Sequence, residues 1–172
     1  MFLKQPDLKD IDRIEAFLDS YPESDQWIAG TSSLHRYHGK LDQWINLMKN
    51  WSQGKELPVG RVPVIQWLCL DEKGTMIGAI NLRPHLNDYL LHSGGQIGYV
   101  VHPDYRFKGV ASWMLGEALK KAHELGNERI LITCRASNKA SQATIKKWKG
   151  VLEDQRIEKG VRVNRYWIDL PS

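Results

Sequence analysis

Hydrophobic residues in the first third of the chain recur at helical spacing. Residues 7–18 place most of their apolar side chains on one side, which predicts a helix. Residues 32–51 follow the same period, with an interruption expected at Gly39 because glycine weakens a helix. Residues 1–58 are therefore expected to form a helical N-terminal part.

The hydrophobic pattern changes to that of β-strands after residue 60. The runs "VPVIQWLCL" and "MIGAINLRP", joined by the turn "DEKG", predict a β-hairpin. After the loop "HLNDYLLHSGG" comes a strand, "QIGYVVHP", and then a helix with apolar residues at three- and four-residue spacing from Val110 to Leu125. A buried strand "ERILITC", a helix "NKASQATIKKWKG" and a hairpin from "VLEDQRIE" to "VRVNRYWID" follow.

The order of these elements predicts the fold class. A strand–helix–strand unit in the middle implies a parallel core with a right-handed crossover, and the hairpins on either side are antiparallel. We therefore expect a three-layer α/β fold with a mixed central sheet and helices on both faces. No repeat or linker divides the chain, so residues 1–172 are expected to form one domain, with residues 60–172 supplying the sheet core.

Composition fits one ordinary globular domain. The chain has 172 residues, of which 42% are hydrophobic and 26% charged, which is enough apolar content for a single core. No apolar run approaches membrane-spanning length, and the first residues lack the pattern of a secretory signal. Cys69 and Cys134 have no CxxC partner and are expected to be reduced and buried. Together these features predict a cytoplasmic protein.

The charge balance is basic, with a net charge of +4 and a pI of about 9.0. Such a balance is compatible with nucleic acid, anionic lipid or a phosphorylated ligand. The cationic residues are scattered and form no block of five or six, so we expect neither a nucleic-acid partner nor a membrane partner. A nucleic-acid-binding domain is the rival interpretation, and it predicts binding that weakens steeply with salt. A need for cations around one anionic ligand also fits.

The turn before the helix at Val110 carries Arg106, Lys108 and Gly109. Helix starts usually carry a capping Ser, Thr, Asp or Asn, and the helix dipole disfavours cations there. Unpaired N–H groups at a helix start do bind anions, and glycine allows close approach or a positive φ. The turn therefore predicts a diphosphate ligand. Solvated surface charge is the alternative for the two cations.

This turn has the spacing R-x-x-G-x-A, and the P-loop and dinucleotide glycine patterns are absent. "YVVHPDYRFKGVA", together with "NKASQATIKKWKGVLED" downstream, resembles the GNAT superfamily of acetyl-CoA-dependent N-acyltransferases. The order of predicted elements agrees with that family from residue 60 to the end. Within it, "INLRPHLNDYLL" and "RYWIDL" are similar to a group of bacterial predicted acetyltransferases of unsettled substrate.

The resemblance implies an N-acetyltransferase with acetyl-CoA as co-substrate and no metal. Its acceptor would be a small-molecule or peptide amine that attacks the thioester directly, and the family alone suggests a homodimer. The strand ending at residue 101 would diverge from "ERILITC" and pair its backbone with the pantetheine arm, while the turn would bind the pyrophosphate. Residues at the start of the later helix would reach the pantetheine or the phosphates. The implied cofactor-binding residues are Tyr99, Val100, Val101, Arg106, Phe107, Lys108, Gly109, Val110, Ala111, Asn138 and Ser141.

Two positions depart from the family pattern. Ile145 stands where many relatives carry a tyrosine acid, and Gln96 begins the strand on which relatives often place a glutamate base. The catalytic residues are therefore left open. A non-catalytic acyl-CoA-binding or sensing module is the alternative function.

The loop after the second strand of the first hairpin is a candidate acceptor site, because functional groups gather on loops held by a sheet. Turn formation is the alternative, since Asn and Asp bond their own backbone. The candidate residues are Arg83, His85, Asn87 and Tyr89. His35, His38 and Asp42 have helical spacing, but without a further ligand motif they favour a solvated helix face, and no metal site is expected.

Overall fold

The computed structural model describes residues 1–21 and 27–171. Short helical turns are labelled η, and η3 is a single turn of π-helix. The elements in chain order are β1 (Phe2–Lys4), η1 (Leu8–Asp10), α1 (Ile11–Asp19), η2 (Leu34–Tyr37), α2 (Leu41–Ser52), β2 (Ile65–Leu70), β3 (Met76–Leu82), η3 (Leu90–Gly94), β4 (Ile97–Val101), η4 (Pro103–Tyr105), α3 (Val110–Glu124), β5 (Arg129–Arg135), α4 (Lys139–Lys147), β6 (Val151–Glu158) and β7 (Val161–Asp169).

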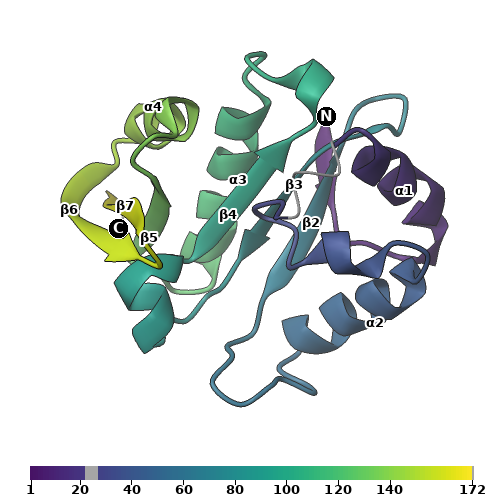
Figure 1. Cartoon of the computed structure of the whole chain (residues 1–172), viewed down its shortest axis with the longest axis horizontal. Coiled ribbons are helices and arrows are strands. Elements are labelled where there is room, and N and C mark those ends of the chain that lie inside the picture. Colours follow the sequence, from purple (N-terminus) through teal and green to yellow (C-terminus); the bar gives the residue numbers. More distant parts are fainter. Residues whose placement is uncertain (22–26, 172) are drawn as a thin grey trace.

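The described strands form two antiparallel sheets, in the orders β1-β2-β3-β4 and β5-β7-β6. Helices α1 and α2 cover one face of the first sheet and α3 covers the other, so the fold has three layers (Figure 1). Alternation along β3 separates the two cores: Ala79 packs with α1 and α2, whereas Ile80 packs with α3. The predicted α/β fold with helices on both faces is confirmed.

The strand–helix–strand unit β4–α3–β5 is present, but its two strands do not form the parallel ladder that we expected. They belong to different sheets and meet at one point, where Gln96 N–H donates to the Leu131 carbonyl at 2.7 Å. Leu131 N–H then donates to the side-chain Oε1 of Gln96, at 3.0 Å, instead of to a backbone carbonyl. This side chain takes the place of the next ladder bond, and the strands diverge beyond it.

Several local predictions are confirmed. The helical segment at residues 32–51 is interrupted at Gly39, which has φ +70° and separates η2 from α2. Both cysteines are free; Cys69 is buried, and Cys134 is half-buried rather than buried.

Two elements were not predicted. The three residues of β1 pair with Leu68–Leu70 of β2, which makes the N-terminus part of the first sheet. The expected loop at residues 85–95 contains η3, which packs on the second sheet through a 3.1 Å bond from Arg165 Nε to the Leu91 carbonyl. Within the described residues, no helix is long and apolar enough to cross a bilayer.

Candidate active site

Gln96 stands at the point where β4 and β5 separate. Its side chain is 2% exposed and uses both ends of its amide: Oε1 accepts from Leu131 N–H, and Nε2 lies 3.2 Å from Asn127 Oδ1 and 3.4 Å from the Arg83 carbonyl. A neutral amide with all these bonds holds the strands together and is no proton acceptor. Sequence reasoning noted Gln96 only as a departure from a glutamate and missed this role.

We expect Gln96→Leu to lower the free energy of unfolding by about 1–3 kcal/mol, because the buried Leu131 N–H would lose its acceptor. Urea denaturation measures the change. Gln43→Leu, on the exposed side of α2, is the matched control and should change stability little. Equal effects of the two substitutions would show that the Gln96 bonds do not stabilise the strand junction.

The backbone of β4 presents a free edge toward β5. Arg83 N–H donates to the Gln96 carbonyl at 2.8 Å, and His102 N–H donates to the Ile77 carbonyl at 2.9 Å. These two bonds show which opposed residues of β3 and β4 are hydrogen-bonded to each other and which are not. Because such pairs alternate in an antiparallel ladder, Tyr99 and Val101 direct their N–H groups away from β3.

The same alternation corrects one of the predicted contacts. Val100 is paired with Ala79, so its backbone groups face β3 and are not offered at the free edge. The carbonyl of Val101 already accepts bonds from Tyr21 Oη at 2.8 Å and Arg106 Nε at 3.4 Å. Among the described residues, the N–H groups of Tyr99 and Val101 and the carbonyl of Tyr99 have no partner on this edge and are left for a ligand.

The turn from Arg106 to Ala111 leads directly into α3. Phe107 and Gly109 have φ values of +61° and +81°, and a Cβ added at Gly109 would meet no atom within 4 Å. The first backbone bond into the helix runs from Trp113 N–H to the Gly109 carbonyl, so the N–H groups of residues 110–112 have no intrahelical acceptor. Phe107 is 94% exposed. The turn thus presents unpaired donors on an open side, as the sequence predicted for an anion site.

The two cations of the turn lie against neighbouring aromatic rings. The Arg106 guanidinium lies 5.9 Å from the ring centre of Tyr21, and Lys108 Nζ lies 5.3 Å from that of Tyr105. Lys108 Nζ also donates to the Asp104 carbonyl at 2.8 Å. Both belong to the turn that leads into α3 and add positive charge to this part of the surface.

The start of α4 lies across from β4. Asn138 caps the helix by accepting from Ser141 N–H at 3.0 Å, so its side-chain oxygen is engaged within the protein. The hydroxyl of Ser141 lies 2.8 Å from Tyr99 Oη, which links β4 to α4. Ile145 is fully buried in the core shared with α3.

The phenol at this site therefore comes from β4 and not from α4. Burial raises the pKa of Tyr99 to about 12, although the hydrogen bond from Ser141 acts in the opposite direction. The phenol is protonated at neutral pH and can donate a hydrogen bond. Sequence reasoning used only the backbone of Tyr99 and missed its side chain.

The candidate acceptor residues divide into two groups. Asn87 is a turn residue: its Oδ1 accepts from Leu90 N–H at 2.9 Å, and its Nδ2 donates to the Gly60 carbonyl at 2.8 Å. His85 and Tyr89 are exposed, whereas Arg83 is half-buried. The loop brings Tyr89 close enough to Arg83 to influence its guanidinium, and Arg61 does so from the loop that Asn87 holds.

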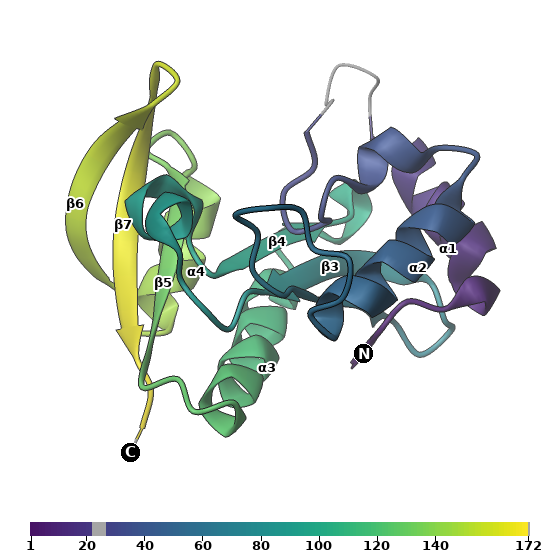
Figure 2. The same cartoon turned by 90° about the horizontal axis from the view of Figure 1, so that it is seen from below.

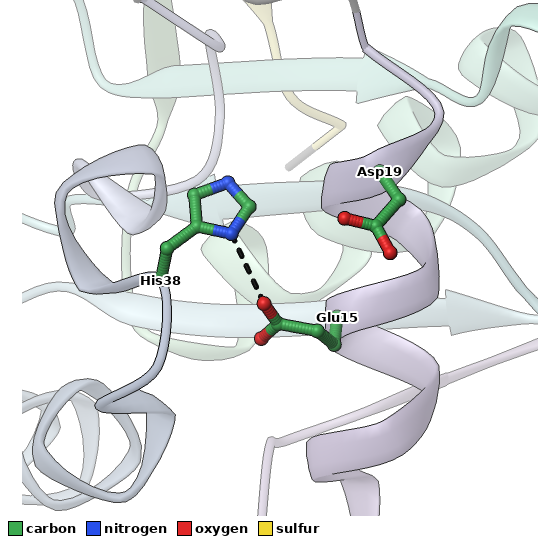
Figure 3. A group of neighbouring side chains, drawn as sticks. All are labelled: Glu15, Asp19 and His38. Carbon is green, nitrogen blue, oxygen red and sulfur yellow. Dashed lines mark hydrogen bonds and ion pairs between the residues drawn. The ribbon is translucent and has the colours of Figure 1, made fainter.

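The structure groups His38 with other residues than the His35 and Asp42 that share its helical spacing in the sequence. Within the described residues, His38 groups with Glu15 and Asp19, whose ligand atoms lie within 4.8 Å of one another (Figure 3). His38 Nδ1 lies 3.0 Å from Glu15 Oε1, and the group is largely exposed. His35 instead packs its ring against Trp27 at 5.9 Å. Exposed acidic groups of this kind are ordinary surface chemistry.

A hollow of about 620 Å³ lies away from the β4–β5 junction, over η3 and the strands β6 and β7. Several of its charged groups are paired with one another, as in the 2.8 Å contacts of Arg165 with Glu153 and Asp154. Arg129 lies 4.0 Å from the ring centre of Trp167. This hollow contains none of the groups described above at β4, the turn or α4.

Comparison with known proteins identifies the family. Residues 1–150 match the family model described as an acetyltransferase (GNAT) domain. No curated protein sequence matches.

Solved structures of similar fold include a chimera of the spermidine N-acetyltransferase SpeG from Vibrio cholerae with hSSAT. It has a TM-score of 0.66 and 16% identity, with 98% of this chain and 96% of that chain covered. The microcin C7 self-immunity acetyltransferase MccE, in complex with acetyl-CoA and AMP, has a TM-score of 0.70 and 16% identity over 98% and 91% of the two chains. An acetyltransferase of the GNAT family from Streptococcus pneumoniae has a TM-score of 0.65 and 20% identity over 99% of each chain. Because the family model covers most of its length, the protein belongs to the GNAT acetyltransferase family and is an acyltransferase.

Proposed function

We propose that the protein transfers the acetyl group of acetyl-CoA to an amine. The observation that carries this proposal is that, within residues 1–21 and 27–171, the N–H groups of Tyr99 and Val101 on β4 and those that open α3 after Gly109 have no partner in the protein. The N–H groups at the turn suit a diphosphate, and those on β4 suit the carbonyl oxygen of an acyl group. The structural neighbour MccE is described with acetyl-CoA bound, which supports the same donor here.

The described residues fit two parts of acetyl-CoA, the charged pyrophosphate and the polar pantetheine arm. The N–H groups at the start of α3, with Arg106 and Lys108 beside them, would hold the pyrophosphate, and the absence of a Cβ at Gly109 leaves room for it. The edge of β4 would pair with the amides of the pantetheine arm as an added strand does. Acetyl-CoA supplies the acyl thioester.

The residues at the junction suit direct attack by an amine. The new N–C bond would form as the C–S bond breaks, and the Tyr99 N–H, which points away from β3, would donate to the carbonyl oxygen as it gains charge. The Tyr99 phenol, beside Ser141 on α4, would donate a hydrogen bond to the departing sulfur.

The pKa values decide what the phenol does. A thiol ordinarily has a pKa of about 8.5, whereas that of Tyr99 is raised to about 12. Transfer of the phenol proton to the thiolate would be uphill, so Tyr99 stabilises the thiolate by donation and keeps its proton. The amine loses its protons to water, and Gln96, being a fully bonded amide, takes no part in that step.

Release of free thiol from acetyl-CoA in the presence of an amine panel tests this function. We expect release above the rate without amine for at least one member of the panel, in proportion to enzyme concentration. The panel should contain amino acids, a peptide N-terminus, a polyamine and an aminoglycoside. Stable binding of acetyl-CoA with no release for any amine would contradict acetyl transfer to amines.

The spermidine acetyltransferase among the structural neighbours supports an amine acceptor in general terms. Small-molecule and peptide amines both remain candidates within this proposal. A homodimer stays a prediction of the family resemblance, and a cytoplasmic location stays a prediction from the composition of the chain.

A further inference from the structure

Arg83 continues the line of side chains on the face of β3 that the N-terminal helices cover. Asn81 lies on that face, where its Nδ2 donates to Ser32 Oγ at 3.2 Å. Arg83 is two residues farther along, and its N–H is bonded to the Gln96 carbonyl where β4 and β5 separate. Alternation therefore places the Arg83 side chain on the same face, next to the junction.

Two loops flank this position. Tyr89 follows Arg83 on one loop, and Arg61 lies on the loop before β2; both influence the Arg83 guanidinium electrostatically. The bond from Asn87 Nδ2 to the Gly60 carbonyl holds the two loops together. Ile65 at the start of β2 pairs with Leu82 at the end of β3, so the segment before β2 and the segment after β3 lie at the same end of these two strands (Figure 2).

Within the part of the chain that the structure describes, Arg83 differs from the other half-buried or buried arginines in having no counter-charge. Arg165 is paired with Glu153 and Asp154, and Arg13 approaches Asp10 at 3.4 Å and donates to the Gly74 carbonyl at 2.8 Å.

Among residues 1–21 and 27–171, no carboxylate or hydrogen-bond acceptor is recorded for the Arg83 guanidinium. Burial lowers the pKa of Arg83, Tyr89 acts in the opposite direction, and the nearby Arg61 lowers it further. Removing a charge from water without a partner is unfavourable, so the site is suited to an anion from outside the chain.

We propose that Arg83, assisted by Arg61, binds an oxyanion of the acceptor, so that the acceptor is an amine that also carries a carboxylate or a phosphate. The inference rests on the proposed acetyl transfer. A guanidinium presents paired donors that match both groups. Because Tyr99 follows Gln96 by three residues, the anion and the reacting amine would be within about 10 Å of each other at about 3.4 Å per residue. A polyamine would place further cations beside two arginines and is disfavoured.

Anion binding can be measured without knowledge of the acceptor. The protein is first saturated with CoA, which occupies the turn at Gly109, and is then titrated with inorganic phosphate or with propionate while thermal unfolding is followed. We expect a saturable rise in Tm with at least one of these anions, relative to chloride at equal ionic strength. Which of the two anions stabilises the protein distinguishes a phosphate-bearing from a carboxylate-bearing acceptor.

Arg83→Gln should abolish this response, and Arg162→Gln, an exposed arginine on β7, should retain it. No response of the wild-type protein to either anion, or an equal response in Arg83→Gln, would overturn the anion site. Failure of CoA itself to raise the Tm would instead count against the proposed function. In that case the anion titration would be repeated on the protein without CoA, and the change in Tm would again be compared between Arg83→Gln and Arg162→Gln.

Matched acceptors extend the test to turnover. Thiol release is compared for phosphoethanolamine and ethanolamine, for β-alanine and ethylamine, and for spermidine. The proposal predicts that an anionic member has a kcat/KM at least about tenfold above its uncharged partner, equivalent to about 1.4 kcal/mol, and that Arg83→Gln removes the difference. A preference for spermidine or for the uncharged members would contradict it.

Discussion

Gly109→Val should weaken acetyl-CoA binding by about 10²-fold, or about 2.7 kcal/mol. Gly109 has φ +81° and its open side faces no other part of the protein within 4 Å. A β-branched side chain would project into the space in front of the unpaired N–H groups of α3, where the pyrophosphate is proposed to bind. It would also strain the backbone by about 1–2 kcal/mol, because the left-handed region disfavours residues with a Cβ. Isothermal titration with acetyl-CoA measures the affinity.

The matched control separates strain from lost binding. Gly126, after α3, has φ +87° and likewise no atom within 4 Å of an added Cβ. Gly126→Val should therefore destabilise the fold by a similar amount in urea denaturation but leave the affinity for acetyl-CoA unchanged. If the two variants bind acetyl-CoA equally well, the turn at Gly109 is not the pyrophosphate site.

Tyr99→Phe should reduce kcat by about 10²-fold with little change in the KM for acetyl-CoA, a loss of the size seen when one transition-state hydrogen-bond donor is removed. The substitution keeps the ring in the core and removes only the hydroxyl that lies 2.8 Å from Ser141 Oγ. Steady-state thiol release with the best amine of the panel gives both constants. Tyr37→Phe, on η2 at the other core, is the matched control and should leave kcat unchanged.

The pH profile distinguishes donation from proton transfer. Because the pKa of Tyr99 is raised to about 12, the phenol remains protonated throughout the range in which the amine becomes neutral. The rate of the wild-type protein should rise with pH and show no loss from Tyr99 below about pH 10, roughly two units under that pKa. A fall in kcat near neutral pH that disappears in Tyr99→Phe would mean that the phenol ionises there, contrary to this account.

The local sequence predicted the elements whose pattern is complete within a few residues. The helix at Val110 begins at the predicted residue, because the apolar spacing and Gly109 both mark its start. The interruption at Gly39 and the closing hairpin around Gly160 follow from glycine at positive φ. The strand β1 has only three residues, too few to show a period, and its existence depends on pairing with β2.

The sequence indicated only the part of the candidate site whose residues are contiguous in the chain. The turn from Arg106 to Ala111 is one contiguous motif, and its open geometry follows from residues next to one another in the chain. The contact between Tyr99 and Ser141 joins residues 42 positions apart, and the divergence of β4 and β5 depends on how Gln96 meets Leu131, 35 positions away. No local pattern encodes either distance. The isolation of Arg83 likewise appears only when the loops around it are assembled.

Titration of the wild-type protein with acetyl-CoA tests the central claim most directly. We expect saturable binding at one site per chain with a dissociation constant in the micromolar range, a binding free energy of about −8 kcal/mol, and competition by CoA for the same site. Absence of binding by a folded protein would contradict the assignment of the β4 edge and the Gly109 turn to the donor.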